Sequence, residues 1–158
     1  MAEVLELYLE DEAQTERLGR LLAGTVAAPA LLFLRGDLGA GKTTLSRGFI
    51  QACGHTGPVK SPTYTLIEPY ELGERRIFHL DLYRLSDPGE LDYLGLDDML
   101  GDETILLVEW PERGSTHLPA ADLEISLQHR EQGRQATLHA HNRRAQDWLA
   151  RLAAHFPP

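Results

Sequence analysis

The sequence is poor in three things, and each shortage excludes a class of protein. It has one cysteine, Cys53, which rules out an internal disulfide and fits a reducing cytoplasm. No apolar stretch approaches the roughly 20 residues that span a bilayer. The acidic, alternating start MAEVLELYLEDE does not predict a signal peptide. Positive charge is also scarce, because 24 acidic and 15 basic residues leave a formal net charge of −9. Tight binding of nucleic acid by this chain alone is therefore not expected.

The bulk composition predicts one ordinary globular domain. The chain has 158 residues, of which 42% are hydrophobic and 25% charged. A chain of this length buries about 68 to 70% of its unfolded surface around one core. We therefore expect a single domain over residues 1–158, without repeats or low-complexity segments.

The most informative segment is GDLGAGKT, residues 36–43, which has the form G-x-x-x-x-G-K-[ST] of a phosphate-binding loop. It follows the apolar run 30–34 and precedes a helical pattern. The glycines allow the backbone to curl so that successive N–H groups point at an anion, and the free amides of the following helix add to them. The motif predicts that Lys42 reaches the β- and γ-phosphates of a nucleotide and that the Thr43 hydroxyl binds Mg²⁺.

The scarcity of lysine strengthens this interpretation. Lys42 and Lys60 are the only lysines among the 15 basic residues. The chain otherwise uses arginine, whose broad guanidinium would crowd the phosphates where a compact ammonium fits. The alternative is a glycine-rich turn that matches the motif by chance, and the strand before it and the helix after it disfavour that alternative.

Periodicity predicts an α/β protein with a P-loop NTPase-like three-layer fold. Residues 3–9 alternate as a strand, and Asp11 with Gln14 marks the start of a helix that runs to about Gly24. A strand over 30–34, the loop and a helix over 42–52 follow. The segment 54–62 is expected to be a loop because it is rich in glycine and proline.

The second half continues the central mixed sheet. Strands are predicted over 63–70, where the alternation is weak, over 76–82 and over 105–108. Ser86 or Asp87, followed by Pro88, predicts one short acidic helix that carries leucines and Met99. Residues 122–128 and 135–141 predict a C-terminal hairpin around a turn that contains Gly133, and a last helix spans about 144–155.

Two acids are placed where such folds bind magnesium and activate water. Glu109 comes at the end of a short buried strand, the position at which phosphate-loop folds place the acid that holds Mg²⁺ or its waters. The alternative is a solvated carboxylate at a strand end. Asp81 shares a strand face with His79 and Tyr83, and a carboxylate there needs a cation, a metal or a water as partner. We expect it to orient or deprotonate the attacking water, the alternative being an exposed position on an edge strand.

Two further groups of polar residues are open to two interpretations. The hydroxyls in Ser61–Thr65 follow the helix of the phosphate loop, as nucleotide-sensing segments do, so Thr63 or Thr65 could sense the γ-phosphate or Mg²⁺. A proline-stiffened loop leading into a strand explains them equally well. His139 and His141 have the spacing of metal ligands on one strand, but without a carboxylate or cysteine partner we interpret them as solvated.

Four segments together resemble the bacterial TsaE (YjeE) family of small ATPases in tRNA threonylcarbamoyladenosine synthesis. They are GDLGAGKTT (36–44), SPTYTL (61–66), HLDLYRL (79–85) and VEWPERG (108–114), in the order and spacing of the family. The resemblance covers about residues 3–115. It implies binding of ATP and Mg²⁺ and action together with TsaD-like and TsaB-like proteins, with tRNA contacted only indirectly and no membrane involved.

The resemblance also implies a role for each matching residue. Lys42, Asp81 and Glu109 would serve hydrolysis, and Thr43 and Glu109 would hold the Mg²⁺ ion. Thr15 would approach the base, and Trp110 would pack beside the site. The residues expected to bind the nucleotide are Thr15, Gly36, Asp37, Leu38, Gly39, Ala40, Gly41, Lys42, Thr43 and Thr44.

Three functions are compatible with such a loop. The first is an Mg²⁺-dependent ATPase, slow alone and stimulated by partners, which is needed for turnover of the complex that forms threonylcarbamoyladenosine next to the anticodon. The second is a small-molecule kinase, for which the chain shows no arginine-rich lid segment. The third is a binding module whose shape is controlled by nucleotide binding, without hydrolysis. The absence of an Asn-Lys-x-Asp motif favours ATP over GTP.

Overall fold

A seven-stranded mixed sheet runs through the molecule in the order β1-β7-β6-β2-β5-β4-β3. The computed structural model describes residues 3–156, with Ser115 described by its backbone alone. The strands are β1 (Val4–Leu9), β2 (Ala30–Arg35), β3 (Ile67–Leu72), β4 (Arg75–Asp81), β5 (Thr104–Glu109), β6 (Leu123–Arg130) and β7 (Gly133–Ala140). The α-helices are α1 (Glu12–Ala23), α2 (Lys42–Ala52), α3 (Leu96–Met99) and α4 (Arg143–Ala153). Short 3₁₀ helices span Pro88–Tyr93, Pro111–Arg113 and Ser115–His117.

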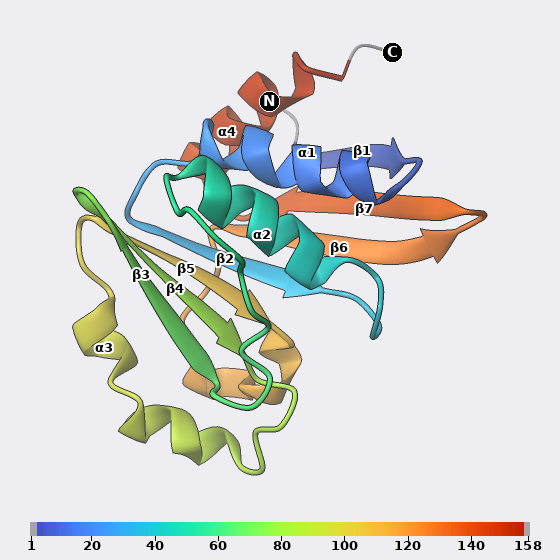
Figure 1. Cartoon of the computed structure of the whole chain (residues 1–158). Helices are drawn as coiled ribbons and strands as arrows, with labels where there is room; N and C mark the ends of the chain where they lie inside the picture. Colours follow the sequence, from blue (N-terminus) through green and yellow to red (C-terminus); the bar gives the residue numbers. More distant parts are fainter. Residues whose placement is uncertain (1–2, 157–158) are drawn as a thin grey trace.

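The strand directions bring three chain segments to one edge of the sheet. Strands β4, β5, β2 and β6 pair in parallel, whereas β3 and β7 run antiparallel to their neighbours (Figure 1). The carboxyl ends of β2, β5 and β4 therefore lie side by side. In α/β sheets this edge is where ligands bind, so the topology places the site there.

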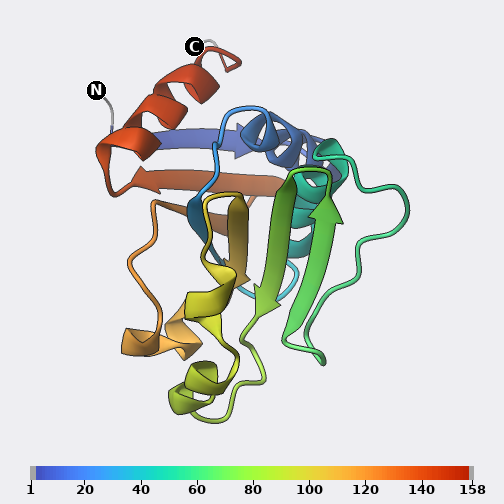
Figure 2. The same cartoon turned by 90° about the vertical axis from the view of Figure 1, so that its left-hand side faces the viewer.

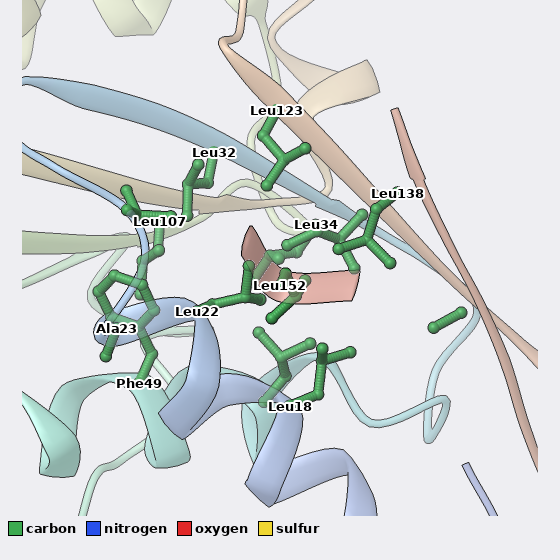
Figure 3. Packing of buried hydrophobic residues seen from close by; sticks show 14 of the residues in the cluster. Leu18, Leu22, Ala23, Leu32, Leu34, Phe49, Leu107, Leu123, Leu138 and Leu152 are labelled. Carbon is green, nitrogen blue, oxygen red and sulfur yellow. The ribbon is translucent and has the colours of Figure 1, made fainter. Parts of the chain in front are cut away.

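Helices α1, α2 and α4 cover one face of the sheet (Figures 1 and 2). Figure 3 shows leucines of α1, α4 and four strands packed with Phe49 of α2 in this layer. Many of these side chains are completely buried, and burying one leucine contributes about 1.5 to 3 kcal/mol. The packing fixes α2, and with it the end of the phosphate loop, against the sheet.

The start of α1 is capped as the sequence predicts. The Asp11 carboxylate accepts a hydrogen bond from the Gln14 backbone N–H at 2.9 Å. The Gln14 side chain in turn accepts from the N–H of Glu10 at 3.2 Å, one residue earlier than a capping box predicts. The helix ends at Ala23, with Gly24 as its C-cap.

Within residues 3–156, the opposite face is covered over β2, β5 and β4 by the segments 85–100 and 110–121, which flank β5 in the chain, so the third layer is partial. The prediction of one short helix after Pro88 is wrong. A 3₁₀ helix with Asp87 as its N-cap ends at Tyr93, and α3 begins at Leu96. Gly95 between them has φ +71°, which interrupts any continuous helix.

Two strand predictions need smaller corrections. Strand β3 begins at Ile67 and not at residue 63, because the N–H of Leu66 bonds to Pro62 O at 2.8 Å and Leu66 has φ +67°. The hairpin turn is formed by 131–132, and Gly133 is the first residue of β7. A Cβ at Gly133 would lie 2.2 Å from Leu9 O, so glycine is required by the close approach of β1.

The hairpin is part of the central sheet. Strand β6 pairs with β2 in parallel, and β7 lies between β6 and β1.

None of the helices within residues 3–156 is both long and apolar enough to traverse a lipid bilayer.

Candidate functional site

The two predicted acids are neighbours at the carboxyl edge of the sheet. Asp81 ends β4 and Glu109 ends β5, and the two residues are register partners in these parallel strands. The two residues are 3% and 2% exposed. The interpretations of Asp81 as an exposed residue on an edge strand and of Glu109 as a solvated residue are therefore wrong.

The phosphate loop joins β2 to α2, as predicted, and its glycines adopt backbone angles that other residues avoid. Gly36 has φ +152°, and a Cβ there would lie 2.6 Å from Leu127 O of β6. Gly41 is the N-cap of α2 with φ +110° and lies against the Thr15 methyl group. Side chains are excluded at both positions, so the backbone amides of the loop are left accessible at the start of α2.

Lys42 is buried at the foot of this loop. Its ammonium donates to Gly36 O and lies 3.4 Å from the centroid of the Trp110 ring. Trp110 itself adopts φ +57° directly after Glu109. Burial lowers the pKa of Lys42 below 10.5, and Glu109 and Asp81 are the strongest of the carboxylates that oppose the shift. An ammonium that has lost water in this way is poised to gain from an anionic ligand.

Glu109 forms hydrogen bonds of unequal length with two neighbouring residues. His79 Nε2 lies 2.6 Å from Glu109 Oε2, and both residues are buried. The Thr43 hydroxyl donates to the same carboxylate over 3.3 Å to either oxygen. Thr43 of the loop and Glu109 of β5, the two residues expected to bind Mg²⁺, are thus in contact.

Asp81 accepts two hydrogen bonds. Thr63 Oγ1 donates to Asp81 Oδ2 at 2.9 Å, and the N–H of Tyr83 donates to Oδ1 at 3.0 Å. Thr65 instead donates to Glu68 at 3.2 Å, and it does not line the hollow that contains Asp81 and Glu109. The hydroxyl segment therefore contributes Thr63 to the site, and Ser61 supports it through an Oγ–Oγ1 contact of 2.7 Å.

Two hollows flank the phosphate loop. One, of about 200 Å³, is lined by Lys42, Thr43, Thr63, Asp81 and Glu109 among others. The second, of about 220 Å³, lies on the other side of the loop and is lined by residues of α1, by Gly39–Gly41, Thr44 and the turn of the hairpin. Thr15 lines the second hollow and is separate from the acids.

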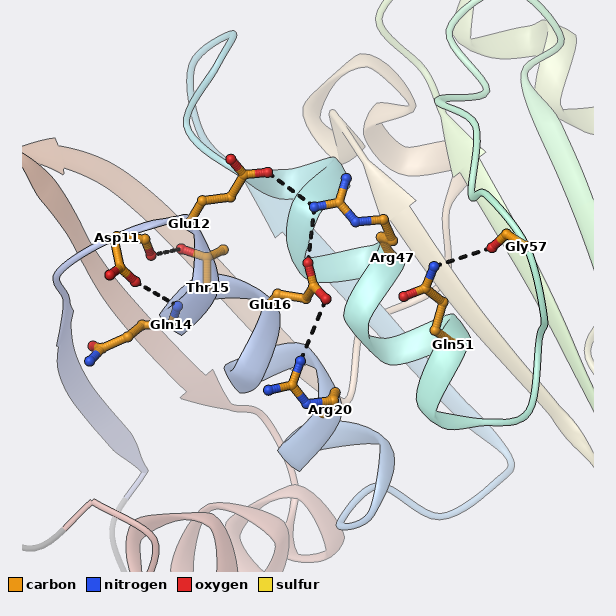
Figure 4. Close-up of polar contacts among 9 residues, drawn as sticks. All are labelled: Asp11, Glu12, Gln14, Thr15, Glu16, Arg20, Arg47, Gln51 and Gly57. Carbon is orange, nitrogen blue, oxygen red and sulfur yellow. Dashed lines mark hydrogen bonds and ion pairs between the residues drawn. The ribbon is translucent and has the colours of Figure 1, made fainter.

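The N-terminal half of α1 is fixed to α2 beside this second hollow. Arg47 of α2 donates to Glu12 and Glu16 of α1, each at 3.0 Å (Figure 4). Figure 4 also shows Thr15 in the first turn of α1, next to Asp11. The contacts join the part of α1 that contains Thr15 to helix α2.

Arg134 is a part of the site that the sequence did not reveal. From β7, its Nε donates to Ala40 O and its terminal nitrogen to Gly39 O, both at 3.1 Å. It therefore holds two carbonyls of the phosphate loop and lines the second hollow. No local motif marks Arg134, because the contact joins residues more than 90 positions apart.

The donors at the acids suit a hard divalent cation. They are a hydroxyl and carboxylates, the oxygen ligands that Mg²⁺ prefers. Within the part of the chain that the structure describes, no three His, Cys, Asp or Glu residues form a complete metal site. Mg²⁺ usually binds through one or two carboxylates together with substrate phosphates, so a complete protein cage is not required.

The structure brings most of the predicted site residues together. Lys42, Thr43, Asp81 and Glu109 line one hollow, and Thr44 lines both. Asp37 and Leu38 are exposed on the loop; Leu38 lines the first hollow, whereas Asp37 lines neither. His139 and His141 lie outside the site, and His141 pairs with Glu124 at 2.8 Å.

Comparison with known proteins identifies the family. The family described as "Threonylcarbamoyl adenosine biosynthesis protein TsaE" matches residues 9–137. The chain is 43% identical to the tRNA threonylcarbamoyladenosine biosynthesis protein TsaE of Haemophilus influenzae, over 86% of this chain and 89% of that one. It is 38% identical to the protein of the same name from Nostoc, over 94% and 93%. The crystal structure of Bacillus subtilis YdiB superposes with a TM-score of 0.84 at 30% identity and covers 99% of both chains. The chain belongs to the TsaE family.

Proposed function

We propose that this chain binds ATP with Mg²⁺ and hydrolyses it in support of threonylcarbamoyladenosine formation on tRNA. The single observation that carries the proposal is the convergence of Lys42, Thr43, Asp81 and Glu109 on one hollow at the end of the phosphate loop. A cation, a hydroxyl and two acids from three separate segments meet there. Packing alone does not demand that combination, because each buried charge costs free energy.

The triphosphate would be bound by backbone amides and Lys42. Each charge-assisted hydrogen bond contributes about 1.5 to 3 kcal/mol, whereas a helix dipole contributes about 0.3 to 1 kcal/mol, so the amides should dominate. Lys42 would exchange its contact with Gly36 O for the phosphates. The base would lie in the hollow beside Thr15, on the other side of the loop.

Thr43 and Glu109 would hold the Mg²⁺ ion. Their side chains are already in contact, and both supply oxygen. The ion would neutralise charge on the β- and γ-phosphate oxygens. The ion would also give the buried carboxylate of Glu109 a cationic partner, which a buried charge requires.

Asp81 would orient and deprotonate the attacking water. Its two hydrogen bonds, from Thr63 and Tyr83, fix the carboxylate next to Glu109. Because Thr63 lies in the loop before β3, a change in that loop would alter the position of Asp81. The same contact would let the loop respond to the γ-phosphate.

The role in tRNA modification is extended from the relatives, which are named tRNA threonylcarbamoyladenosine biosynthesis proteins. We infer that hydrolysis supports turnover of a complex with TsaD-like and TsaB-like proteins. The net charge of −9 agrees with leaving the contact with tRNA to those partners.

The proposal is tested by measuring phosphate release with the chain alone, and then with TsaD-like and TsaB-like proteins and tRNA. We expect slow release alone and faster release with the partners. Labelled γ-phosphate on a metabolite would instead indicate a kinase. Absence of release under every condition would contradict the ATPase.

Asp81→Asn separates hydrolysis from a nucleotide-gated binding function. We expect phosphate release to fall by about 10² to 10⁴, the usual contribution of a general base, while ADP affinity stays within a few-fold. Glu68→Gln, outside the hollow, is the control. If the Asp81→Asn protein binds ATP normally and still supports tRNA modification in cells, hydrolysis is dispensable and the binding function is correct.

A further inference from the structure

His79 is a buried side chain beside the proposed magnesium site, and the function proposed so far gives it no role. It lies in β4 two residues before Asp81, on the same face of the sheet, and is 0% exposed. Its register partner on β5 is Leu107, so Glu109 is its diagonal neighbour. The imidazole reaches that neighbour through the contact of 2.6 Å between Nε2 and Glu109 Oε2.

The direction of this hydrogen bond follows from the form of Glu109 that binds a cation. That form is an ionised carboxylate, which can only accept, so Nε2 carries the proton and donates. Nδ1 at the other side of the ring is buried and, in the part of the chain that the structure describes, has no hydrogen-bond partner. A buried polar atom without a partner costs stability, and an apolar side chain would avoid that cost. Packing therefore does not explain the imidazole, whereas its contact with Glu109 does.

The two contacts of Glu109 differ in a way that suits metal binding. At 2.6 Å the bond from His79 is at the short end for a charge-assisted hydrogen bond. At 3.3 Å to each oxygen, the bond from Thr43 is longer than the usual 2.7 to 2.8 Å for hydroxyl donors. The Thr43 hydroxyl can thus leave the carboxylate at little cost, while the imidazole stays.

We propose that His79 is a positioning residue for magnesium binding. By holding Oε2, it fixes the rotation of the Glu109 carboxylate and leaves Oε1, which among the described residues contacts only the Thr43 hydroxyl, for the ion. The inference rests on the proposed function, because it assigns a supporting residue to the same site. Hydrogen bonds from a second residue to a metal ligand typically change metal affinity or activity by about 10- to 100-fold.

The test is calorimetric titration of ADP with and without Mg²⁺ into three variants of the full chain. His79→Met removes the donor at similar volume, and His79→Gln keeps an N–H donor near the position of Nε2. His139→Met is the matched control, because His139 is exposed on β7. Circular dichroism and thermal unfolding establish that each variant is folded.

We expect His79→Met to reduce the Mg²⁺-dependent gain in ADP affinity by about 10- to 100-fold and to leave ADP affinity without Mg²⁺ within about twofold. His79→Gln should recover most of the gain, and His139→Met should behave as the wild type. An equal loss with and without Mg²⁺, or no loss in a folded His79→Met protein, would overturn the inference. If the wild type itself binds no nucleotide, the proposed function fails instead, so the two failures are distinguishable.

Discussion

At the residue scale, the site is a set of buried charges that compensate one another. Lys42 is 5% exposed, and it is enclosed by an aromatic ring and by carboxylates that it does not contact directly. Asp81 and Glu109 are satisfied by hydroxyl, amide and imidazole donors. This arrangement leaves the cation short of a strong anionic partner, which a phosphate would supply.

The first prediction concerns the pKa of Lys42 in the protein without nucleotide. Lys60→Arg makes Lys42 the only lysine of the chain, so its side-chain NMR signals can be assigned without ambiguity. We expect titration below 10.5, because burial disfavours the ammonium. Glu109→Gln should lower this pKa further, since it removes the strongest of the opposing charges.

The sign of the linked change in stability follows from that shift. Between the lowered pKa and 10.5 the unfolded chain binds more protons at this site than the folded chain. The contribution of Lys42 to the free energy of unfolding therefore increases with pH over this interval. A titration midpoint at or above 10.5 in the Lys60→Arg protein would contradict the account.

The sequence predicted Glu109 at the end of a buried strand, where the structure has it, and Asp81 within a strand, whereas it ends β4. The two acids are adjacent because parallel strands place their carboxyl ends together, and their roles stay predictions. The choice between Thr63 and Thr65 was not predictable, since it depends on the turn before β3 and on the positive φ of Leu66. Arg134 could not be predicted at all, because only the folded sheet brings β7 to the loop.

At the element scale, two glycines let α1 and α2 cross closely. A Cβ at Gly19 would lie 2.1 Å from Leu45 O, and a Cβ at Gly48 would lie 2.2 Å from Glu16 O. Both obstacles are backbone atoms, which cannot move as a flexible side chain does. The close crossing allows Arg47 of α2 to reach two carboxylates of α1 (Figure 4).

The second prediction follows from this crossing. Gly19→Ala should lower the free energy of unfolding by more than about 2 kcal/mol, because it forces the two helices apart. Gly24→Ala is the matched control: its nearest neighbour would be 3.7 Å away, and φ is −82°. That variant should be unchanged or more stable by about 0.4 to 1 kcal/mol. Equal denaturation midpoints for the two variants would be inconsistent with a close helix contact.

The third prediction concerns the link between the hairpin and the phosphate loop. Arg134→Met removes the donors to Gly39 O and Ala40 O, so the loop loses the contact that holds these two carbonyls beside the proposed nucleotide site. We expect ADP affinity to fall about tenfold, the lower range for hydrogen bonds to a charged group. Arg130→Met, on the exposed part of the same hairpin, should leave affinity unchanged. Affinity equal to the wild type in Arg134→Met would mean that the contact is incidental.

The element predictions failed where one residue decided the backbone. The pattern 88–99 has helical spacing of leucines, yet Gly95 splits it into two short helices. Periodicity shows which residues are apolar, but it does not show whether a residue with left-handed backbone angles interrupts the helix. Helix α2, by contrast, was predicted with its exact bounds because the phosphate loop fixes its start.

At the scale of the whole molecule, the sheet is covered unevenly. One face carries α1, α2 and α4, and the other is covered only next to the site (Figure 2). Over β6, β7 and β1 the second face presents mainly polar side chains, including Glu6, Ser126, Gln128, Gln135 and Thr137. The sequence predicted three layers but could not predict how far the third one extends, since that depends on where the segments before and after β5 fold back over the sheet.

The central claim is that the loop, Lys42 and the two acids form a binding site for a magnesium nucleotide. The most direct measurement is calorimetric titration of magnesium ADP into the wild-type chain and into Lys42→Ala. We expect saturable binding at one site in the wild type and an affinity about 10- to 100-fold lower in the variant, because a charge-assisted contact is lost. No heat of binding in the wild type, or equal affinity in a folded Lys42→Ala protein, would contradict it.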